Sequence, residues 1–239
     1  MTIVIDDPLI AGMTIRRPLP LHASSRRLRE LYPESPRVSG VAVMSDVSRR
    51  RWWPLADAVT GERLQTMFDA QRRDVGPPTA ARQLAATLAH VVVGRVVALV
   101  ALEARAWDPG LENLWVHVDS DGVIDWVGVV DPTVRMLDDD PYDGDARVVR
   151  LPGEAALATW TAHRCHRTLT PLFTELHRVS GGAMPVATMW RIVGSAVVGA
   201  ATHVPLLAGS GRAAGERRGQ AVLDAFVSFG LPVRKGLLN

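Results

Sequence analysis

The chain has 239 residues, of which 47% are hydrophobic and 22% are charged, and its formal net charge at pH 7 is +2. This composition supplies enough apolar material for a sizeable core and excludes disordered, collagen-like and disulfide-scaffold proteins. Cys165 is the single cysteine, so these residues hold no intrachain disulfide, cysteine-rich zinc site or cysteine-held iron–sulfur cluster.

The positive charges are almost all guanidinium groups, because Lys235 is the only lysine among 27 basic residues. Such donors suit carboxylate, phosphate and sulfate groups. No long basic run contains interleaved aromatic residues, so we do not expect nucleic-acid binding. Asp6 and Asp7 stand where a signal peptide needs positive charge, which favours a cytoplasmic protein.

The first third of the chain changes from irregular to helical. Prolines interrupt residues 1–52, which we expect to pack irregularly on the main domain, with a short helix over 25–31 and an edge strand over 41–44. Helices are predicted over 61–73 and from Pro78 to about Ala106.

The most apolar stretch, Leu84 to Leu102, approaches the length of a membrane span. It contains His90 and Arg95, which are costly at bilayer depth. A buried helix is therefore predicted, and no membrane association.

A β-rich insertion at about 113–136 divides the helices. The runs 114–118 and 123–130 flank the Gly-ended turn 119–122, a pattern typical of a hairpin. Three further helices are predicted over 154–179, 185–206 and 212–229. The fold class is thus mainly α with a small antiparallel sheet (α+β), and residues 53–239 form its helical domain.

Three of the predicted helices carry a line of small polar residues at helical spacing, which we call polar seams. Either their members satisfy one another across helix interfaces, or they line a polar pocket between helices, since unpartnered burial costs roughly 1–3 kcal/mol per group. The seams are Gln83, Thr87, His90 and Gly94; Thr159, His163, His166 and Thr170; and Thr188, Arg191, Ser195, Gly199 and Thr202.

The order of these elements resembles the FhuF-like family of ferric-siderophore reductases over roughly residues 55–230. The likeness rests on Cys165-His166 with a following Pro171-Leu172, and mainly on the helix that begins Met189-Trp190 and runs into small residues. The family's cysteine segment for a [2Fe–2S] cluster is absent, and Arg191-Ile192 replace its Gly-Asn.

The resemblance without the cluster implies non-redox chemistry and no cofactor or metal. It implies a role like aziridine formation in azinomycin-type antibiotic biosynthesis, where an amine displaces sulfate on an amino-acid substrate bound to a small acidic amino-group carrier protein. We expect that carrier to dock on Arg49–Arg51 or Arg72–Arg73.

Such a reaction needs anion donors for the sulfate and a base for the amine. We expect the donors to be Arg82, Arg191, Thr188 and Ser195, and the base to be one of His90, His166 and Asp46.

Two alternatives stay open. One is a cluster-less FhuF-like protein that binds a siderophore or related metabolite, or a relative of the reductases whose cysteine tail lies outside this sequence. The other is a helical structural partner without a small-molecule site.

Overall fold

A computed structural model describes residues 13–15, 17–209 and 211–234, so Asp6, Asp7 and Lys235 lie outside the described residues. The fold is 56% helical and 12% strand, a mostly helical α+β architecture as predicted. The helices are α2 Pro20–Glu30, α3 Asp57–Thr60, α4 Arg63–Val75, α5 Pro77–Ala89, α6 Arg95–Glu103, α7 Glu154–Val179, α8 Val186–Leu207 and α9 Arg212–Ser228. The strands are β1 Val41–Val43, β2 Trp52–Pro54, β3 Ala106–Trp107, β4 Leu114–Val118, β5 Ile124–Val129, β6 Val134–Leu137 and β7 Val148–Leu151.

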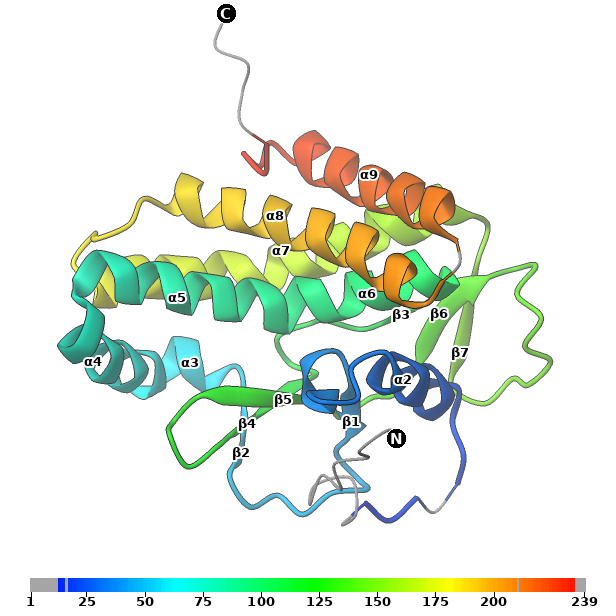
Figure 1. Cartoon of the computed structure of the whole chain (residues 1–239), viewed down its shortest axis with the longest axis horizontal. Coiled ribbons are helices and arrows are strands. Elements are labelled where there is room, and N and C mark those ends of the chain that lie inside the picture. The colour runs from blue at the N-terminus through cyan, green and yellow to red at the C-terminus, as the bar shows by residue number, and fades with distance from the viewer. Residues whose placement is uncertain (1–12, 16, 210, 235–239) are drawn as a thin grey trace, which may run out of the picture.

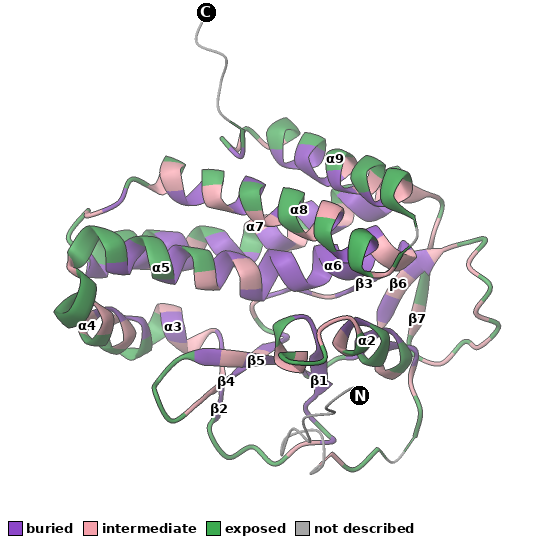
Figure 2. Ribbon diagram, in the orientation of Figure 1, coloured by how far each residue is buried: buried purple, intermediate pink, exposed green. Residues whose placement is uncertain are grey.

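One long helix forms the centre of the molecule (Figure 1). It consists of α5, a π-helical turn at His90–Gly94 and α6, and it packs against α7, α8 and α9. Every residue from Val91 to Ala101 is buried, and Figure 2 shows this part of the ribbon in the buried colour. Helices cover this segment on several sides, so it has no polar outer face, and its one charged residue, Arg95, is itself buried.

Among the described residues, two helices are long and apolar enough to cross a membrane. In the long helix, 83% of the most apolar 18-residue window is buried inside the fold, as expected for a core helix. In α8, 39% of the equivalent window is buried. The cytoplasmic location stays a prediction.

The larger sheet has the strand order β1-β5-β4-β2 and separates two apolar clusters. Side chains alternate between its faces along each strand. Trp53 and Val116 join the main core beneath the helices, whereas Trp52 and Trp126 form a small cluster with Ala42 and Met44 on the other face. The adjacent tryptophans of β2 therefore belong to opposite faces.

The predicted hairpin is confirmed as β4 and β5, but the wholly antiparallel sheet is wrong. The edge strand β1 runs parallel to β5, and a second sheet of order β3-β6-β7 contains the parallel pair β6–β7. The edge strand predicted over 41–44 is confirmed as β1. Strands β2 and β3 have only three and two residues, too few to show alternation in the sequence. The larger sheet joins β1, which lies in the N-terminal segment 1–52, to strands of the region 53–239.

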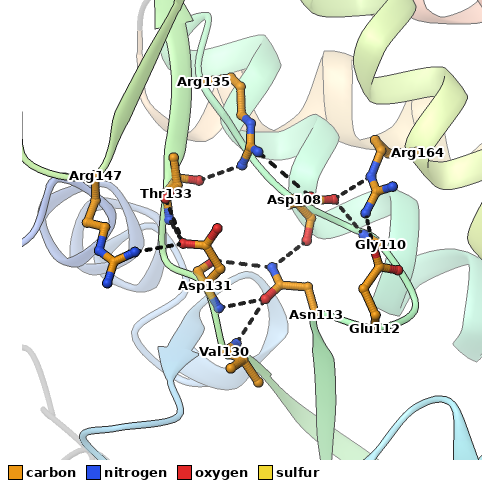
Figure 3. A network of polar contacts seen from close by, with 10 residues as sticks. All are labelled: Asp108, Gly110, Glu112, Asn113, Val130, Asp131, Thr133, Arg135, Arg147 and Arg164. Atoms are coloured by element: carbon orange, nitrogen blue, oxygen red, sulfur yellow. Dashed lines mark hydrogen bonds and ion pairs between the residues drawn. The ribbon is translucent and has the colours of Figure 1, made fainter.

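A polar network anchors the base of the β4–β5 hairpin to α7 (Figure 3). The Asp108 carboxylate accepts a hydrogen bond from Arg164 Nε at 2.7 Å and lies 3.8 Å from the Arg135 guanidinium. The Asn113 amide donates to the carbonyl groups of Asp108 and Asp131 and accepts the N–H groups of Val130 and Asp131. Because all these groups are satisfied, the hairpin is fixed at its base. The turn at its other end lies near α4.

The helices over 61–73, 154–179, 185–206 and 212–229 are confirmed to within two residues at each end. The predicted helix over 25–31 begins five residues earlier, at Pro20, because a proline fits the first turn of a helix. The long helix ends three residues before Ala106, at Glu103, where Ala104 adopts a left-handed conformation.

Candidate functional site

The polar seam of α8 lies on the outer face of this helix, so its interpretation as a buried seam is wrong for most of its length. Arg191 and Ser195 are exposed and Thr188 is half-buried. Arg191 donates to the Thr188 hydroxyl at 2.6 Å, and the Ser195 hydroxyl donates to the Arg191 carbonyl at 3.2 Å. A hydroxyl satisfied by the carbonyl one turn earlier needs no partner from another helix, which explains why spacing alone misled.

The polar seam of α7 also faces outward. Thr159, His163 and Thr170 are exposed, and His166 is half-buried. The His166 ring lies 5.7 Å from the Trp190 ring and 6.0 Å from the Phe229 ring. Burial, together with the neighbouring charges of His163 and Arg167, lowers the pKa of His166. His166 is thus a neutral aromatic packing partner at neutral pH, and no predicted anion donor contacts it among the described residues.

Asp46 and Arg82 lie apart from the other predicted site residues. The Asp46 carboxylate is 2.8 Å from His22 Nε2 and also accepts the Ser45 hydroxyl. His22 Nδ1 accepts the Leu19 backbone N–H at 3.0 Å, so His22 carries its proton on Nε2 and donates it to Asp46. This pair fixes the start of α2. Arg82 is exposed on α5. The roles of these residues in catalysis stay predictions, but the structure does not bring them together.

His90 does lie in a pocket, which we call the π-turn pocket. Its volume is about 270 Å³. It is lined by Tyr32, Val38, Ser39, His90, Gly94, Ala98, Ala196, Gly199, Ala200, His203 and Val204. Members of two polar seams, Gly94 of the long helix and Gly199 of α8, line this pocket together, as the second interpretation of the seams predicts.

The hydrogen bonds of His90 define its tautomer. Its Nε2 is 2.7 Å from the Val38 carbonyl, which only accepts, so Nε2 carries the proton and Nδ1 has a free lone pair. A Cβ at Gly94 would lie 2.7 Å from Nδ1, so the glycine makes room for the ring. Burial and, to a smaller extent, the Arg95 charge lower the pKa of His90 to about 4. His90 is therefore a neutral base at pH 7, and π-helical turns such as this one occur frequently at functional sites.

We expect the folded protein to lose stability as the pH falls from about 6.5 to 4, because over this range the unfolded chain protonates His90 and the folded chain does not. The loss is about 3 kcal/mol in total, since the pKa falls from 6.5 to about 4 and one pKa unit corresponds to about 1.4 kcal/mol. Urea unfolding at several pH values measures it, and His90→Gln should flatten this part of the profile. If the free energy of unfolding depends on pH equally in the unaltered protein and in His90→Gln, the lowered pKa of His90 is contradicted.

A larger pocket lies between α4 and the tip of the β4–β5 hairpin, and we call it the hairpin pocket. Its volume is about 570 Å³, enough for a ligand of drug-like size. No local sequence pattern indicates this pocket, because its walls come from two segments, residues 51–71 and 118–123, that are distant in the chain. It is lined by Arg51, Trp52 and Trp53; by Arg63, Thr66, Met67, Ala70 and Gln71 of α4; and by residues 118–123 of the hairpin.

Two guanidinium groups in the hairpin pocket have no ion-pair partner among the described residues, those of Arg51 and Arg63. The Arg63 guanidinium lies 5.5 Å from the centre of the Trp53 ring, a contact that restrains its position. The Gln71 side-chain oxygen is buried without a hydrogen-bond partner in the described part of the chain. Apolar surface from Met67, Val118 and other neighbours completes the wall. This combination suits a small ligand with an anionic group and a hydrocarbon part.

The hairpin pocket also brings together the two predicted docking patches for an acidic carrier. Arg51 ends the patch Arg49–Arg51, and Gln71 directly precedes Arg72 and Arg73. The Arg49 guanidinium lies over the Trp115 ring, and Arg72 pairs with Asp69 at 2.9 Å. The patches therefore flank one pocket. No group of three or more His, Cys, Asp or Glu residues suited to a metal ion occurs in the described ranges.

Comparisons with known proteins show likeness at the level of the fold. No family model matches the chain, and no curated protein matches it. A solved structure, that of the aerobactin synthetase IucC from a hypervirulent pathotype of Klebsiella pneumoniae, is similar with a TM-score of 0.55 and 14% sequence identity. The match covers 97% of this chain and 45% of that one, so the chain spans less than half the length of the synthetase. The fold of this protein is thus similar to that of part of an aerobactin synthetase, and the FhuF-like resemblance stays a prediction.

Proposed function

We propose that this protein binds a small anionic metabolite in the hairpin pocket, with Arg51 and Arg63 as the anion donors. The observation that carries the proposal is the pair of guanidinium groups without ion-pair partners in the described structure, beside the wall formed by Trp53 and α4. A guanidinium binds carboxylate, phosphate or sulfate through two parallel hydrogen bonds, which a lysine cannot do.

The likeness to a siderophore synthetase supports a ligand from siderophore or related metabolism, in agreement with the metabolite-binding alternative from the sequence. At 14% identity the likeness concerns the fold, so it supports the class of ligand only as an analogy. The pocket itself indicates the chemistry of the ligand: an acidic group near the guanidiniums and carbon atoms against Met67 and Val118.

An acidic carrier protein remains the partner that we propose. Arg49, Arg50 and Arg73 are exposed beside the pocket and none of them forms an ion pair within the described ranges, so an acidic surface docked there places its cargo at the pocket mouth. Attraction of this kind raises the association rate and weakens with salt.

Ligand titration tests the proposal. We expect the double variant Arg51→Gln and Arg63→Gln to bind glutarate at least about tenfold more weakly than the unaltered protein, because each lost charged hydrogen bond is worth about 1.5–3 kcal/mol. Titration calorimetry or saturation-transfer NMR measures the affinity. The matched control, Arg178→Gln with Arg212→Gln, removes the same charge from exposed residues of α7 and α9 that are absent from the pocket lining and should bind normally. Unchanged affinity in the first variant would refute the proposal.

Ring closure with sulfate elimination is a reaction that this anion site is able to serve, and it stays the first prediction from the sequence. Arg51 and Arg63, rather than Arg82 and Arg191, would then receive the departing sulfate. Release of sulfate from a carrier-bound sulfated amino-acid substrate tests this reaction. Sulfate release by the unaltered protein that is lost in the Arg51 and Arg63 variant supports both the reaction and the site. Binding of the substrate without sulfate release supports a metabolite-binding protein instead.

A further inference from the structure

The hairpin pocket contains negative as well as positive side chains. Asp119 and Asp121 lie in the turn at the tip of the hairpin and line the same cavity as Arg51 and Arg63. None of these four side chains forms an ion pair with a described residue. Opposite charges that line one cavity without contacting each other leave room for a ligand that bridges them.

One carboxylate and one guanidinium of the pocket, those of Asp119 and Arg63, are held in place before any ligand binds. Asp119 Oδ1 accepts the backbone N–H groups of Asp121 and Val123, each at 2.9 Å, which fixes the carboxylate and leaves Oδ2 without a partner among the described residues. On the other side, the Arg63 guanidinium rests against the Trp53 ring. Preorganised groups lose little conformational entropy when a ligand binds, so each contributes more of its interaction to affinity.

The backbone places these groups in a defined order. The Val118 N–H donates to the Arg51 carbonyl at 3.2 Å, so Arg51 lies beside the last residue of β4, immediately before the acidic turn. Arg63 belongs to α4 and lines the same pocket. The carboxylates of the turn and the guanidiniums of Arg51 and Arg63 thus line one pocket, with Arg51 next to the turn and Arg63 on α4.

We propose that the hairpin pocket selects amino-acid-type ligands, whose carboxylate binds the guanidiniums and whose ammonium group binds the carboxylates of Asp119 and Asp121. This inference rests on the proposed function, because it names the class of metabolite that the same pocket takes.

A matched pair of ligands tests it. Glutarate and L-glutamate share one carbon skeleton and differ in the ammonium group. We expect the unaltered protein to bind L-glutamate at least about tenfold more tightly than glutarate, in titration calorimetry or saturation-transfer NMR. In the double variant Asp119→Asn and Asp121→Asn the two affinities should become equal, with glutarate binding retained or slightly increased. Asparagine at 119 keeps an acceptor for the turn, so the fold of the hairpin is preserved.

The control variant Asp138→Asn with Asp139→Asn makes the same charge change at exposed residues that are absent from the pocket lining and should keep the preference for L-glutamate. Equal binding of both ligands by the unaltered protein would overturn the inference and leave the anion site standing. A preference that survives in the Asp119 and Asp121 variant would overturn the assignment to the turn. Binding of neither ligand would overturn the proposed function and the inference together.

Discussion

Replacing Gly194 by alanine is expected to lower the free energy of unfolding by about 2–4 kcal/mol, although alanine is the better helix former. Gly194 is buried in α8, and a Cβ there would lie 1.9 Å from the Val233 carbonyl oxygen. The obstacle is backbone, which a rotamer change cannot move aside. Residues 231–233 must therefore leave their place against α8, and Val233, which is 4% exposed, loses its burial. Urea unfolding monitored by tryptophan fluorescence measures the loss.

Gly199, five residues further along α8, provides the matched control. It is exposed, and nothing lies within 4 Å of a Cβ built on it. Gly199→Ala should therefore gain about 0.5–1 kcal/mol from helix propensity. Removal of residues 232–239 should abolish the Gly194→Ala penalty, because the clashing carbonyl is then gone. A penalty that persists in the shortened chain would show that the close approach of Val233 is not its cause.

Asp125→Ala is expected to destabilise the protein by about 3–5 kcal/mol, the cost of removing one member of a buried charge cluster. Asp125 occupies a β-bulge, since His117 pairs with Trp126 and Val118 with Ile124. Its carboxylate is 2.7 Å from His117 Nδ1 and pairs with Arg37. Arg95, which is 2% exposed, donates to the Asp125 and Gly40 carbonyls, and the Asp125 charge opposes the lowering of its pKa by burial. Asp125 is the opposite charge that acts on the Arg95 guanidinium within the described structure, so its removal leaves that buried charge uncompensated.

Two variants separate charge loss from general damage. Asp125→Asn keeps an acceptor for His117 and should cost less than Asp125→Ala. Asp224→Ala removes an aspartate that is 60% exposed and pairs with Arg234 at 2.8 Å, and it should cost less than about 1 kcal/mol. Thermal or urea unfolding of the three variants gives the order of their stabilities. An Asp125→Ala protein as stable as Asp224→Ala would refute the stabilising role of the Asp125 charge cluster.

The helices could be predicted well from the sequence because each shows a periodic apolar pattern over many residues. Apolar spacing over 154–179, proline and glycine at the helix ends, and the Gly-ended turn between β4 and β5 all act locally, within a few residues. The short strands β2 and β3 and the π-helical turn at His90–Gly94 carry no comparable signal. Their conformation depends on neighbours that are distant in the chain, such as the pairing of β2 with β4.

The candidate site shows the same division. His90 could be singled out from the sequence, because a polar residue in an otherwise apolar helix requires a partner or a pocket, and the structure provides both. Arg191 and Ser195 satisfied the same spacing rule yet face solvent, since spacing identifies a shared face without saying which way that face points.

The sequence by itself thus determined the helical α+β class, the hairpin, and a chain whose positive charge is almost entirely arginine. Only the tertiary structure decided which arginines are free to bind a ligand. Arg164 and Arg218 are engaged by carboxylates that lie more than fifty residues away, whereas Arg51 and Arg63 face a pocket formed by α4 and the hairpin tip. The physical reason is that an ion pair depends on distance in space, and folding brings some charges within reach while it separates others.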